Sequence, residues 1–274
     1  GGRKKGIDSV TLSAENGDII NSSSIVTANQ YTNSLNSTSH DSILSAGSIE
    51  SDGLTYIGAK NYISEAGIVS GTTTVIDVKE NISIGSITLN GSDRSGADSG
   101  NYANYDSVQK IGSEITGTEA VILEAGKDIA IKGSTVASDG LVQMTAENIN
   151  ILNEVETIKK ETKQTDNGFM SSYEMEEKSY QEYAAASTVI GNNIILDAGN
   201  DINVRASNII AVKEGLENTG GNISMTAGNN VNILADTLDN SYSRKDQKSG
   251  FSTSFASGGG SFTAGVSYSQ NSLE

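Results

Sequence analysis

Short apolar runs recur along this chain at a nearly constant spacing, and a polar turn follows each run. The phrase VILEAGKDIAIKGSTVASDG begins at Val121, and a close variant, IILDAGNDINVRASNI, begins at Ile194. Repetition of this kind indicates a repeat architecture, so the period is established before any single element. Looser versions of the phrase begin at Val10, Ile43, Tyr56, Val75, Val142 and Ile223.

Alternation within each run predicts short strands with one buried face. Residues 129–131 read Ile-Ala-Ile, and residues 231–233 read Val-Asn-Ile. The spacing from Ile129 to Ile149 is 149 − 129 = 20 residues, and the spacing from Ile63 to Ile82 is 82 − 63 = 19 residues. Strands this short bury little apolar surface alone, but stacked coils cover one another. The pattern therefore predicts an all-β solenoid with one coil per roughly 20 residues.

Roughly nine coils, with adjacent strands about 4.8 Å apart, would give a rod on the order of 45 Å long. The complete absence of Pro agrees with this expectation, because Pro cannot donate a hydrogen bond between strands. Asn tolerates tight turns, and stacked Asn side chains can form hydrogen-bonded ladders. The residues expected in such ladders are Asn148, Asn203, Asn222, Asn230 and Asn232.

Three stretches interrupt the repeat and are predicted to leave the solenoid. The second and third both follow an Asn-Ile-Leu run and contain Gly-Phe, at Phe169 and Phe251, so they are inserted at matching positions. We expect little helix, confined to residues 174–186, where a charge run is typical of a solvated helix or hairpin. The predicted division is coils over 1–90, an excursion over 91–118, coils over 119–152, an excursion over 153–187, coils over 188–238 and an excursion over 239–274.

The segment 249–269 predicts a β-hairpin around three glycines at 258–260. Each arm has nine residues, close to the roughly 9–11 of a membrane-spanning strand, and aromatic residues lie near both ends. Two hypotheses remain open, which are membrane association through this hairpin and packing along the solenoid. Each arm places its apolar residues on one face, namely Phe251, Thr253 and Phe255 on the first and Phe262, Ala264, Val266 and Tyr268 on the second.

The combination of phrases such as ILEAGKDIAIKGSTVAS with excursions such as SRKDQKSGFSTSF resembles the haemagglutinin repeats of filamentous-haemagglutinin-type exoproteins. The resemblance is specific over Val121–Ser269 and weaker over Val10–Leu89. It implies a right-handed, single-stranded parallel β-helix at the bacterial cell surface, exported by the outer-membrane transporter of a two-partner secretion system. It also implies cell adhesion, or delivery of a contact-dependent growth-inhibition toxin into a neighbouring bacterium.

Composition narrows the classes of partner and chemistry. The chain has 34 acidic and 18 basic residues, and a net charge of −16 argues against a nucleic-acid partner. The absence of Cys excludes thiol nucleophiles and Cys-based zinc sites. No apolar run approaches the length of a spanning helix, and no hydrophobic region follows the basic start GGRKKG. We therefore expect an internal fragment of a secreted protein whose export signal lies outside this chain.

Candidate metal and catalytic residues are sparse. The single histidine, His40, lies beside Asp41 and is expected in a solvated turn. Asp93, Asp98 and Asn101 could supply oxygen ligands, but their spacing matches no calcium loop. We expect no cofactor and no metal.

The rung acids Asp18, Asp128 and Asp201 recur at equivalent turn positions, which indicates turn formation rather than a local catalytic cluster. The sequence therefore predicts a non-catalytic structural and interaction segment that acts in cell adhesion through an unknown receptor on a host or neighbouring cell. The first alternative is a toxin-delivery segment that associates with the target outer membrane, and the second is a polysaccharide-active β-helix enzyme. The residues expected on the interaction surface are Phe169, Tyr173, Tyr180, Tyr183, Phe251, Phe255, Phe262, Val266 and Tyr268.

Overall fold

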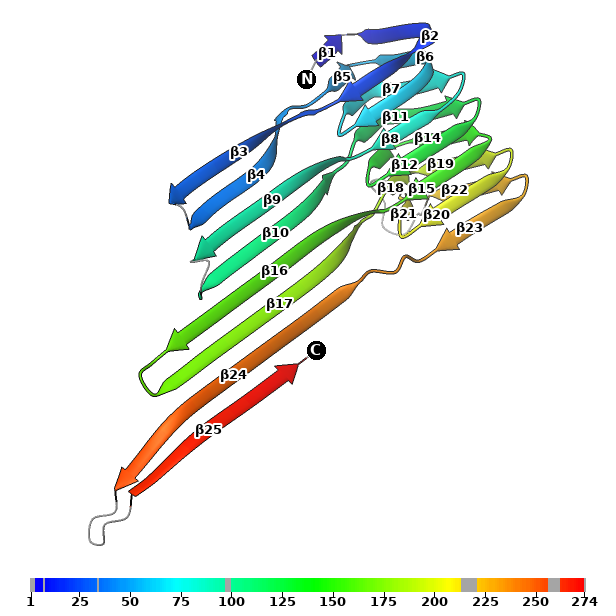
Figure 1. Cartoon of the computed structure of the whole chain (residues 1–274). Helices are drawn as coiled ribbons and strands as arrows, with labels where there is room; N and C mark the ends of the chain where they lie inside the picture. Colours follow the sequence, from blue (N-terminus) through cyan, green and yellow to red (C-terminus); the bar gives the residue numbers. More distant parts are fainter. Residues whose placement is uncertain are drawn as a thin grey trace.

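The computed structural model of the chain describes residues 3–6, 8–33, 35–96, 100–212, 221–255 and 262–273, without the side chains of 3–6, 253–255 and 262–263. Within these ranges every regular element is a β-strand, so none of them contains a helix that could cross a membrane. The strands form a parallel sheet curled into a solenoid and an antiparallel sheet that extends from it (Figure 1). The predicted parallel β-helix is confirmed.

Each coil of the solenoid has three sides, and each side pairs in parallel with the same side of its neighbouring coils. The first side contains β1 (Arg3–Gly6), β5 (Ser48–Ser51), the first halves of β7 (Ile68–Val78) and β11 (Glu114–Ala125), β13 (Thr135–Ser138), β18 (Thr188–Gly191) and β21 (Asn208–Ala211). The second contains the first halves of β2 (Ser9–Ser22) and β6 (Leu54–Glu65), the second halves of β7 and β11, β14 (Leu141–Ala146), β19 (Asn193–Ala198) and β22 (Asn222–Ala227). The third contains the second halves of β2 and β6, β8 (Ile82–Gly85), β12 (Asp128–Lys132), β15 (Asn148–Leu152), β20 (Asp201–Arg205) and β23 (Asn230–Leu234).

These pairings define seven coils in the described part of the chain. They are numbered coil 1 to coil 7 and contain the described strands within residues 3–22, 48–65, 68–85, 114–132, 135–152, 188–205 and 208–234. The expectation of roughly nine coils is wrong, because residues 24–45, which that count treated as solenoid, leave it. At about 4.8 Å per strand, the six steps between seven coils correspond to about 29 Å along the axis.

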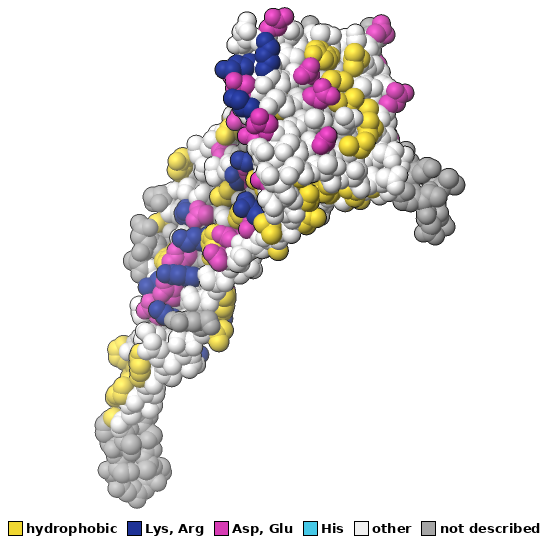
Figure 2. Space-filling model, turned by 90° about the vertical axis from the view of Figure 1, so that its right-hand side faces the viewer, with side chains coloured by type: hydrophobic (Ala, Val, Ile, Leu, Met, Phe, Trp, Pro, Cys, Tyr) yellow, Lys and Arg dark blue, Asp and Glu magenta, His cyan; other side chains and the backbone are white. Residues whose placement is uncertain are grey.

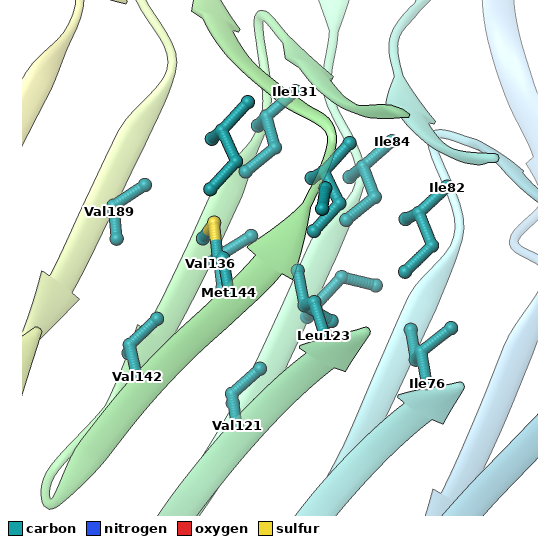
Figure 3. Packing of buried hydrophobic residues seen from close by; sticks show 14 of the residues in the cluster. Ile76, Ile82, Ile84, Val121, Leu123, Ile131, Val136, Val142, Met144 and Val189 are labelled. Carbon is teal, nitrogen blue, oxygen red and sulfur yellow. The ribbon is translucent and has the colours of Figure 1, made fainter. Parts of the chain in front are cut away.

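Inward-pointing side chains fill the bore in rows that run along the axis (Figure 3). Ile129 pairs with Ile82 in coil 3 and with Ile149 in coil 5, and all three are fully buried. The 20-residue spacing of Ile129 and Ile149 is therefore one coil. Fully buried residues visible in Figure 3 include Ile76, Ile82, Ile84, Leu123, Ile131, Val136, Val142 and Met144.

One predicted equivalence is wrong by a single residue. Ile82 pairs with Tyr62 rather than with Ile63, and Tyr62 is the buried member of the two. Since side chains alternate between faces, a slip of one residue exchanges the inner and outer rows. The alternation rule favoured Ile63 because Ile is the commoner bore residue, and the aromatic core residue was missed.

The predicted amide ladders lie on the outside of the solenoid and link successive coils. Asn61 Nδ2 donates to Asp18 Oδ1 at 2.8 Å, and Asn148 Nδ2 donates to Asp128 Oδ1 at 2.8 Å. The backbone and side-chain nitrogens of Asn230 both donate to Asp201 Oδ1 at 3.0 Å. Asp18, Asp128 and Asp201 thus occupy equivalent corners, as their recurrence predicted. Further ladder bonds join Asn203 to Asn150, Asn232 to Asn203 and Asn222 to Asn193.

Four hairpins leave the solenoid from one corner and pair edge to edge. Together they form an eight-stranded antiparallel sheet, called here the hairpin sheet, in which strands follow one another in chain order (Figure 1). Its strands are β3 (Ser24–Asn33), β4 (Asn36–Ser45), β9 (Ile87–Gly96), β10 (Tyr102–Ile111), β16 (Glu154–Asn167), β17 (Ser171–Ala185), β24 (Asn240–Phe255) and β25 (Phe262–Leu273).

The hairpin sheet corrects three expectations. Residues 24–45 form a hairpin, whereas 1–90 was expected to contain only coils. Residues 114–117, expected within the first excursion, already belong to coil 4. The segment 174–186 was allowed to be helical, but β17 covers it up to Ala185 as a strand that pairs with β16 throughout and with β24 up to Gln181. Long-range pairing with β16 and β24 decides its conformation, which local charge patterning could not reveal.

Hairpins depart only after coils 1, 3, 5 and 7. Coils 2, 4 and 6 instead pass to the next coil through two residues, the first of which has a left-handed backbone: Ala66 (φ 52°), Gly133 (φ 55°) and Ala206 (φ 41°). Two coils advance about 9.6 Å along the axis, and one hairpin adds two strands of the same total width. Successive hairpins therefore meet in register.

A row of buried serines links neighbouring coils at this corner, both where a hairpin departs and where a tight turn leads to the next coil. Ser113 Oγ donates to the Gly85 carbonyl across the base of β9 and β10, and Ser187 Oγ donates to the Leu152 carbonyl across the base of β16 and β17. Ser134 Oγ accepts from the Ser113 N–H, and Ser187 Oγ accepts from the Ser134 N–H. The same hydroxyl row thus closes tight turns and hairpin bases alike.

Deleting one coil should disrupt the hairpin sheet, whereas deleting one complete two-coil unit should not. Removal of residues 114–134 joins Ser113 to Thr135 and places two hairpins one coil apart, so β10 and β16 compete for the same space. Removal of residues 114–187 joins Ser113 to Thr188 at an equivalent register position and preserves the alternation. Limited proteolysis should show rapid cleavage of the hairpins in the first deletion and resistance in the second. Equal resistance of both deletions would contradict the spacing argument.

Candidate interaction surface on the hairpin sheet

Charged side chains of both signs follow the hairpin sheet and pair across its strands (Figure 2). Lys178 Nζ lies 3.1 Å from Glu161 Oε1 and 2.6 Å from Glu176 Oε1. Lys163 Nζ lies 2.7 Å from Glu174 Oε1. Opposite charges on neighbouring strands stabilise a sheet by side-chain pairing rather than by burial. The sheet can therefore stand as a single layer.

The titration of these groups reflects their partners. Lys178 holds the pKa of the Glu176 carboxyl below its ordinary value, and the two glutamates raise the pKa of Lys178. Arg244, whose Nε lies 2.9 Å from Asp246 Oδ2, lowers the pKa of that carboxyl. Among the described hydrophobic side chains of the hairpin sheet, Met175 is the one that is buried, and it is 8% exposed. The hairpin sheet therefore depends more on pairing between charged side chains, and less on an apolar core, than the solenoid does.

Apolar side chains gather at the end of the hairpin sheet that is farthest from the solenoid. Phe169, at the tip between β16 and β17, is 98% exposed, and Val266 in β25 is 83% exposed. The Phe251 N–H donates to the Met170 carbonyl at 2.7 Å, which joins the tip of the β16–β17 hairpin to strand β24 of the next hairpin. A hollow of about 340 Å³ lies between them, lined by residues including Phe169, Met170, Phe251 and Val266. This group of four residues, with Tyr268, is called the distal patch.

The structure thus brings Phe169, Phe251, Val266 and Tyr268 to one end of the sheet. Val266 pairs directly with Phe251, and Tyr268, which is 65% exposed, lies two residues farther along β25. The predicted hairpin is present, and its register also pairs Phe255 with Phe262. The side chains of Phe255 and Phe262, and the glycines at 258–260, lie outside the described part of the chain.

Tyr173 borders this region through a smaller hollow of about 90 Å³, which Tyr268 also lines. Its hydroxyl donates to Asp246 Oδ1 at 3.0 Å, and Lys248 Nζ lies 5.3 Å from the centre of its ring. The bond to Asp246 raises the pKa of Tyr173. Tyr173 is therefore held in place beside the distal patch.

Tyr180 and Tyr183 lie in the half of β17 nearer the solenoid, so they do not join the distal patch. Tyr180 donates to Glu182 Oε1 at 2.6 Å, and Tyr183 donates to Gln181 Oε1 at 2.8 Å. They also point to opposite faces, because the pairing of β17 with β16 is regular and side chains alternate. The prediction grouped them with the patch only because they share an excursion.

Two sequence candidates for chemistry have structural roles. His40 lies in β4 rather than in a turn, and its Nε2 is 2.8 Å from Asp93 Oδ1 in β9. Asn101 Oδ1 accepts from the Thr165 N–H, and Asp98 lies outside the described residues. Over the ranges that the structure describes, no three His, Cys, Asp or Glu side chains converge to hold a metal ion.

Sequence reasoning missed an apolar row on the outer face of the solenoid. Tyr56 and Ile122 both pair with Val75, and Ile195 continues the row beyond Gln143. Asp77 and Glu124 lie directly opposite each other beside it. Only the register between coils reveals this row, because its members are far apart in the sequence. Tyr56 and Val75 are 75 − 56 = 19 residues apart, and Ile122 and Ile195 are 195 − 122 = 73 residues apart.

Comparisons with known proteins agree with this organisation. The hemagglutinin repeat model matches residues 87–168 and 167–273, and each match contains two coils and hairpin strands on either side of them. The tRNA nuclease CdiA of Escherichia coli O6:K15:H31 (strain 536 / UPEC) is 38% identical over 144 residues, which cover 49% of this chain and 4% of that protein. The chain therefore spans a small part of the length of that relative. No solved structure was found to match this chain.

Acidification should loosen the hairpin sheet before the solenoid. The carboxyls of Glu176, Glu182 and Asp246 have depressed pKa values, so their pairing stabilises the fold above their ordinary pKa values of 4.5, 4.5 and 3.8. That stabilisation is lost as the pH falls through the lower values of the folded state. Hydrogen exchange, corrected for intrinsic rates, should show a larger loss of protection at pH 3 in β16, β17 and β24 than in β12, β15 and β20.

Two controls separate charge pairing from general acid unfolding. Neutral 1 M NaCl should weaken the same strands, because salt screens exposed pairs. Lys178→Gln should raise exchange in β16 and β17 at neutral pH by roughly two- to fivefold, whereas Lys60→Gln on the solenoid should not. Loss of protection in the solenoid strands first would refute the assignment.

Proposed function

We propose a role in cell-surface recognition on the premise that this chain belongs to the hemagglutinin repeat family, whose model matches more than half of its residues. In this proposal the chain is a non-catalytic structural and interaction segment of a large secreted bacterial exoprotein and acts in cell adhesion. The solenoid sets the reach of the segment, and the hairpin sheet carries its contacts. Export through the outer-membrane transporter of a two-partner system belongs to the same proposal.

The exposed distal patch is the observation that carries the proposal. Phe169 and Val266, at the far end of the hairpin sheet, are the two most exposed of its described large apolar side chains, and paired charges lie along the neighbouring part of the sheet. Large apolar side chains that are grouped and exposed mark contact surfaces, because a partner that covers them removes apolar area from water. Aromatic residues at the centre of such surfaces commonly carry much of the binding free energy. The patch therefore fits a receptor on a host or neighbouring cell.

A second candidate function is delivery in contact-dependent growth inhibition. The matched relative is named a tRNA nuclease CdiA, and β25 contains no charged residue while it exposes Val266 and Tyr268. Such a strand can contact the outer membrane of a target bacterium without burying charge. By contrast, Asp18, Asp128 and Asp201 accept ladder bonds from asparagines at the coil corners, so these three acids have a structural role and do not support the polysaccharide-active alternative.

Substitution of the distal patch should strongly reduce cell binding and leave the fold intact. We expect Phe169→Ser combined with Val266→Ser and Tyr268→Ser to reduce binding of the labelled fragment to receptive cells at least about tenfold, because exposed apolar anchors are removed. Flow cytometry over a concentration series gives the measurement. The matched control is Ile195→Ser with Tyr183→Ser, which removes apolar area on the solenoid and at the base of the sheet.

The two candidate functions predict different behaviour towards lipid. Flotation with vesicles of outer-membrane lipid should carry the fragment upward in the delivery case, and Phe255→Asp with Val266→Asp should prevent this. In the adhesion case, neither the parent fragment nor this variant should float with the vesicles. Cell binding should then be lost after protease treatment of the cells. Undiminished cell binding by the triple serine variant would reject the distal patch for both functions.

A further inference from the structure

The third side of the solenoid points two rows of side chains into the bore, and their chemistry changes along the axis. In coils 3 to 6 both rows are aliphatic and buried. In coil 1 the second row contains Asn21, and in coil 2 the two rows contain Tyr62 and Ser64. The aliphatic members are Ile82, Ile129, Ile149 and Ile202 in the first row and Ile84, Ile131, Ile151 and Val204 in the second.

Tyr62 and Ser64 bring unpartnered hydroxyls into the bore. Their exposed fractions are 0% and 1%, and neither the Tyr62 hydroxyl nor Ser64 Oγ reaches a hydrogen-bond partner. Burial raises the pKa of Tyr62. A hydroxyl buried without a partner gives up the bonds that it makes to water when the chain opens. These two groups therefore favour opening at coil 2.

Asn21 shows that polar contacts replace apolar packing at the corner of the first hairpin. Its Nδ2 donates to the Ile68 carbonyl of coil 3 at 3.1 Å. A Cβ added to Gly47 or Gly67 would lie 2.5 Å from an Asn21 side-chain atom, so both glycines are needed to admit the amide. Coils 4 and 5 have serines of the buried row, Ser113 and Ser134, at the equivalent corner.

The hairpin sheet is weakest at the same place. The hairpin β3–β4 meets β9 over only four residue pairs, from Ser37–Arg94 to His40–Gly91. By comparison, β10 meets β16 over seven pairs, and β17 meets β24 over eleven. The polar side chains of the third side and the shortest ladder of the hairpin sheet thus coincide at the junction between the unit made of coils 1 and 2 with β3–β4 and the rest of the molecule. This unit is called the first module. The bond from Asn21 to Ile68 crosses this junction and has to break when it opens.

We propose that the first module opens away from coils 3 to 6 as a unit, so that the shaft has a built-in yielding section. Segments of a protein open locally where few apolar contacts and few hydrogen bonds oppose opening. Opening between coils 2 and 3 exposes the two hydroxyls to water and breaks the short β4–β9 ladder, while the aliphatic bore of coils 3 to 6 remains closed. A shaft with such a section bends or extends under load without losing its remaining coils.

Hydrogen exchange read by mass spectrometry tests the proposal on the intact chain. Coils 2 and 6 each have one coil beyond them in the described chain, so an effect of the solenoid ends alone would treat them alike. Residues 54–65 should exchange at least about tenfold faster than residues 193–205. Tyr62→Phe with Ser64→Ala, which only removes the unpartnered oxygens, should slow exchange in residues 54–65 and in β4 together.

The control variant carries Tyr56→Phe and Ser83→Ala, which remove two hydroxyls that point outward. It should leave the exchange rates of residues 54–65 and of β4 unchanged. Tyr62→Phe alone provides a second variant, since it removes one oxygen from a ring that is already buried. Equal exchange of coils 2 and 6 in the parent would overturn the proposal. So would faster exchange of coil 2 that neither Tyr62 variant reduces, or exchange of β4 that does not follow coil 2.

Discussion

The spacing of hydrogen-bonded strands, about 4.8 Å, constrains both parts of this molecule at once. In the solenoid it is the rise of one coil, and in the hairpin sheet it is the distance between neighbouring strands. A hairpin contributes two strands, so it can depart only once in every two coils if the sheet is to remain continuous. The alternation of hairpins with the tight turns at Ala66, Gly133 and Ala206 satisfies this condition. Each match of the family model likewise contains two coils.

The two parts are stabilised by different forces. Each fully buried aliphatic side chain in the bore contributes roughly 1.5–3 kcal/mol, whereas an exposed ion pair contributes roughly 0–1 kcal/mol. The solenoid is therefore the stable scaffold, and the hairpin sheet depends on its backbone ladder, its attachment at the corner and many weak pairs. This division suits a segment whose shaft holds position and whose arm meets a partner. Hairpin length is also free to vary, from ten residues in β3 to sixteen in β24, because the spacing rule limits only the number of strands.

The polar groups of the bore show how the same architecture accommodates a local weakness. In adjacent coils, Tyr62 is equivalent to Ile82 and Ser64 is equivalent to Ile84. The backbone pairing between the two coils is regular despite the change in side chains. The ladder thus tolerates side chains that the bore does not favour. The cost appears as two buried hydroxyls without partners, next to the shortest junction of the hairpin sheet.

Local alternation in the sequence was sufficient to predict the coils, the bore residues Ile129, Ile149 and Ile202, the asparagine ladders and the pairing of β24 with β25, because each depends on neighbours along the chain or on a repeated phrase. The sequence did not determine the hairpin at 24–45, the strand at β17, or the burial of Tyr62 in place of Ile63. Each of these depends on a partner strand tens of residues away, and a shift of one residue in that pairing reverses the face. The distal patch was predicted only as a set of residues. Its assembly, with Phe169 beside Phe251 and Val266 but without Tyr180 and Tyr183, was decided by the edge-to-edge pairing of separate hairpins.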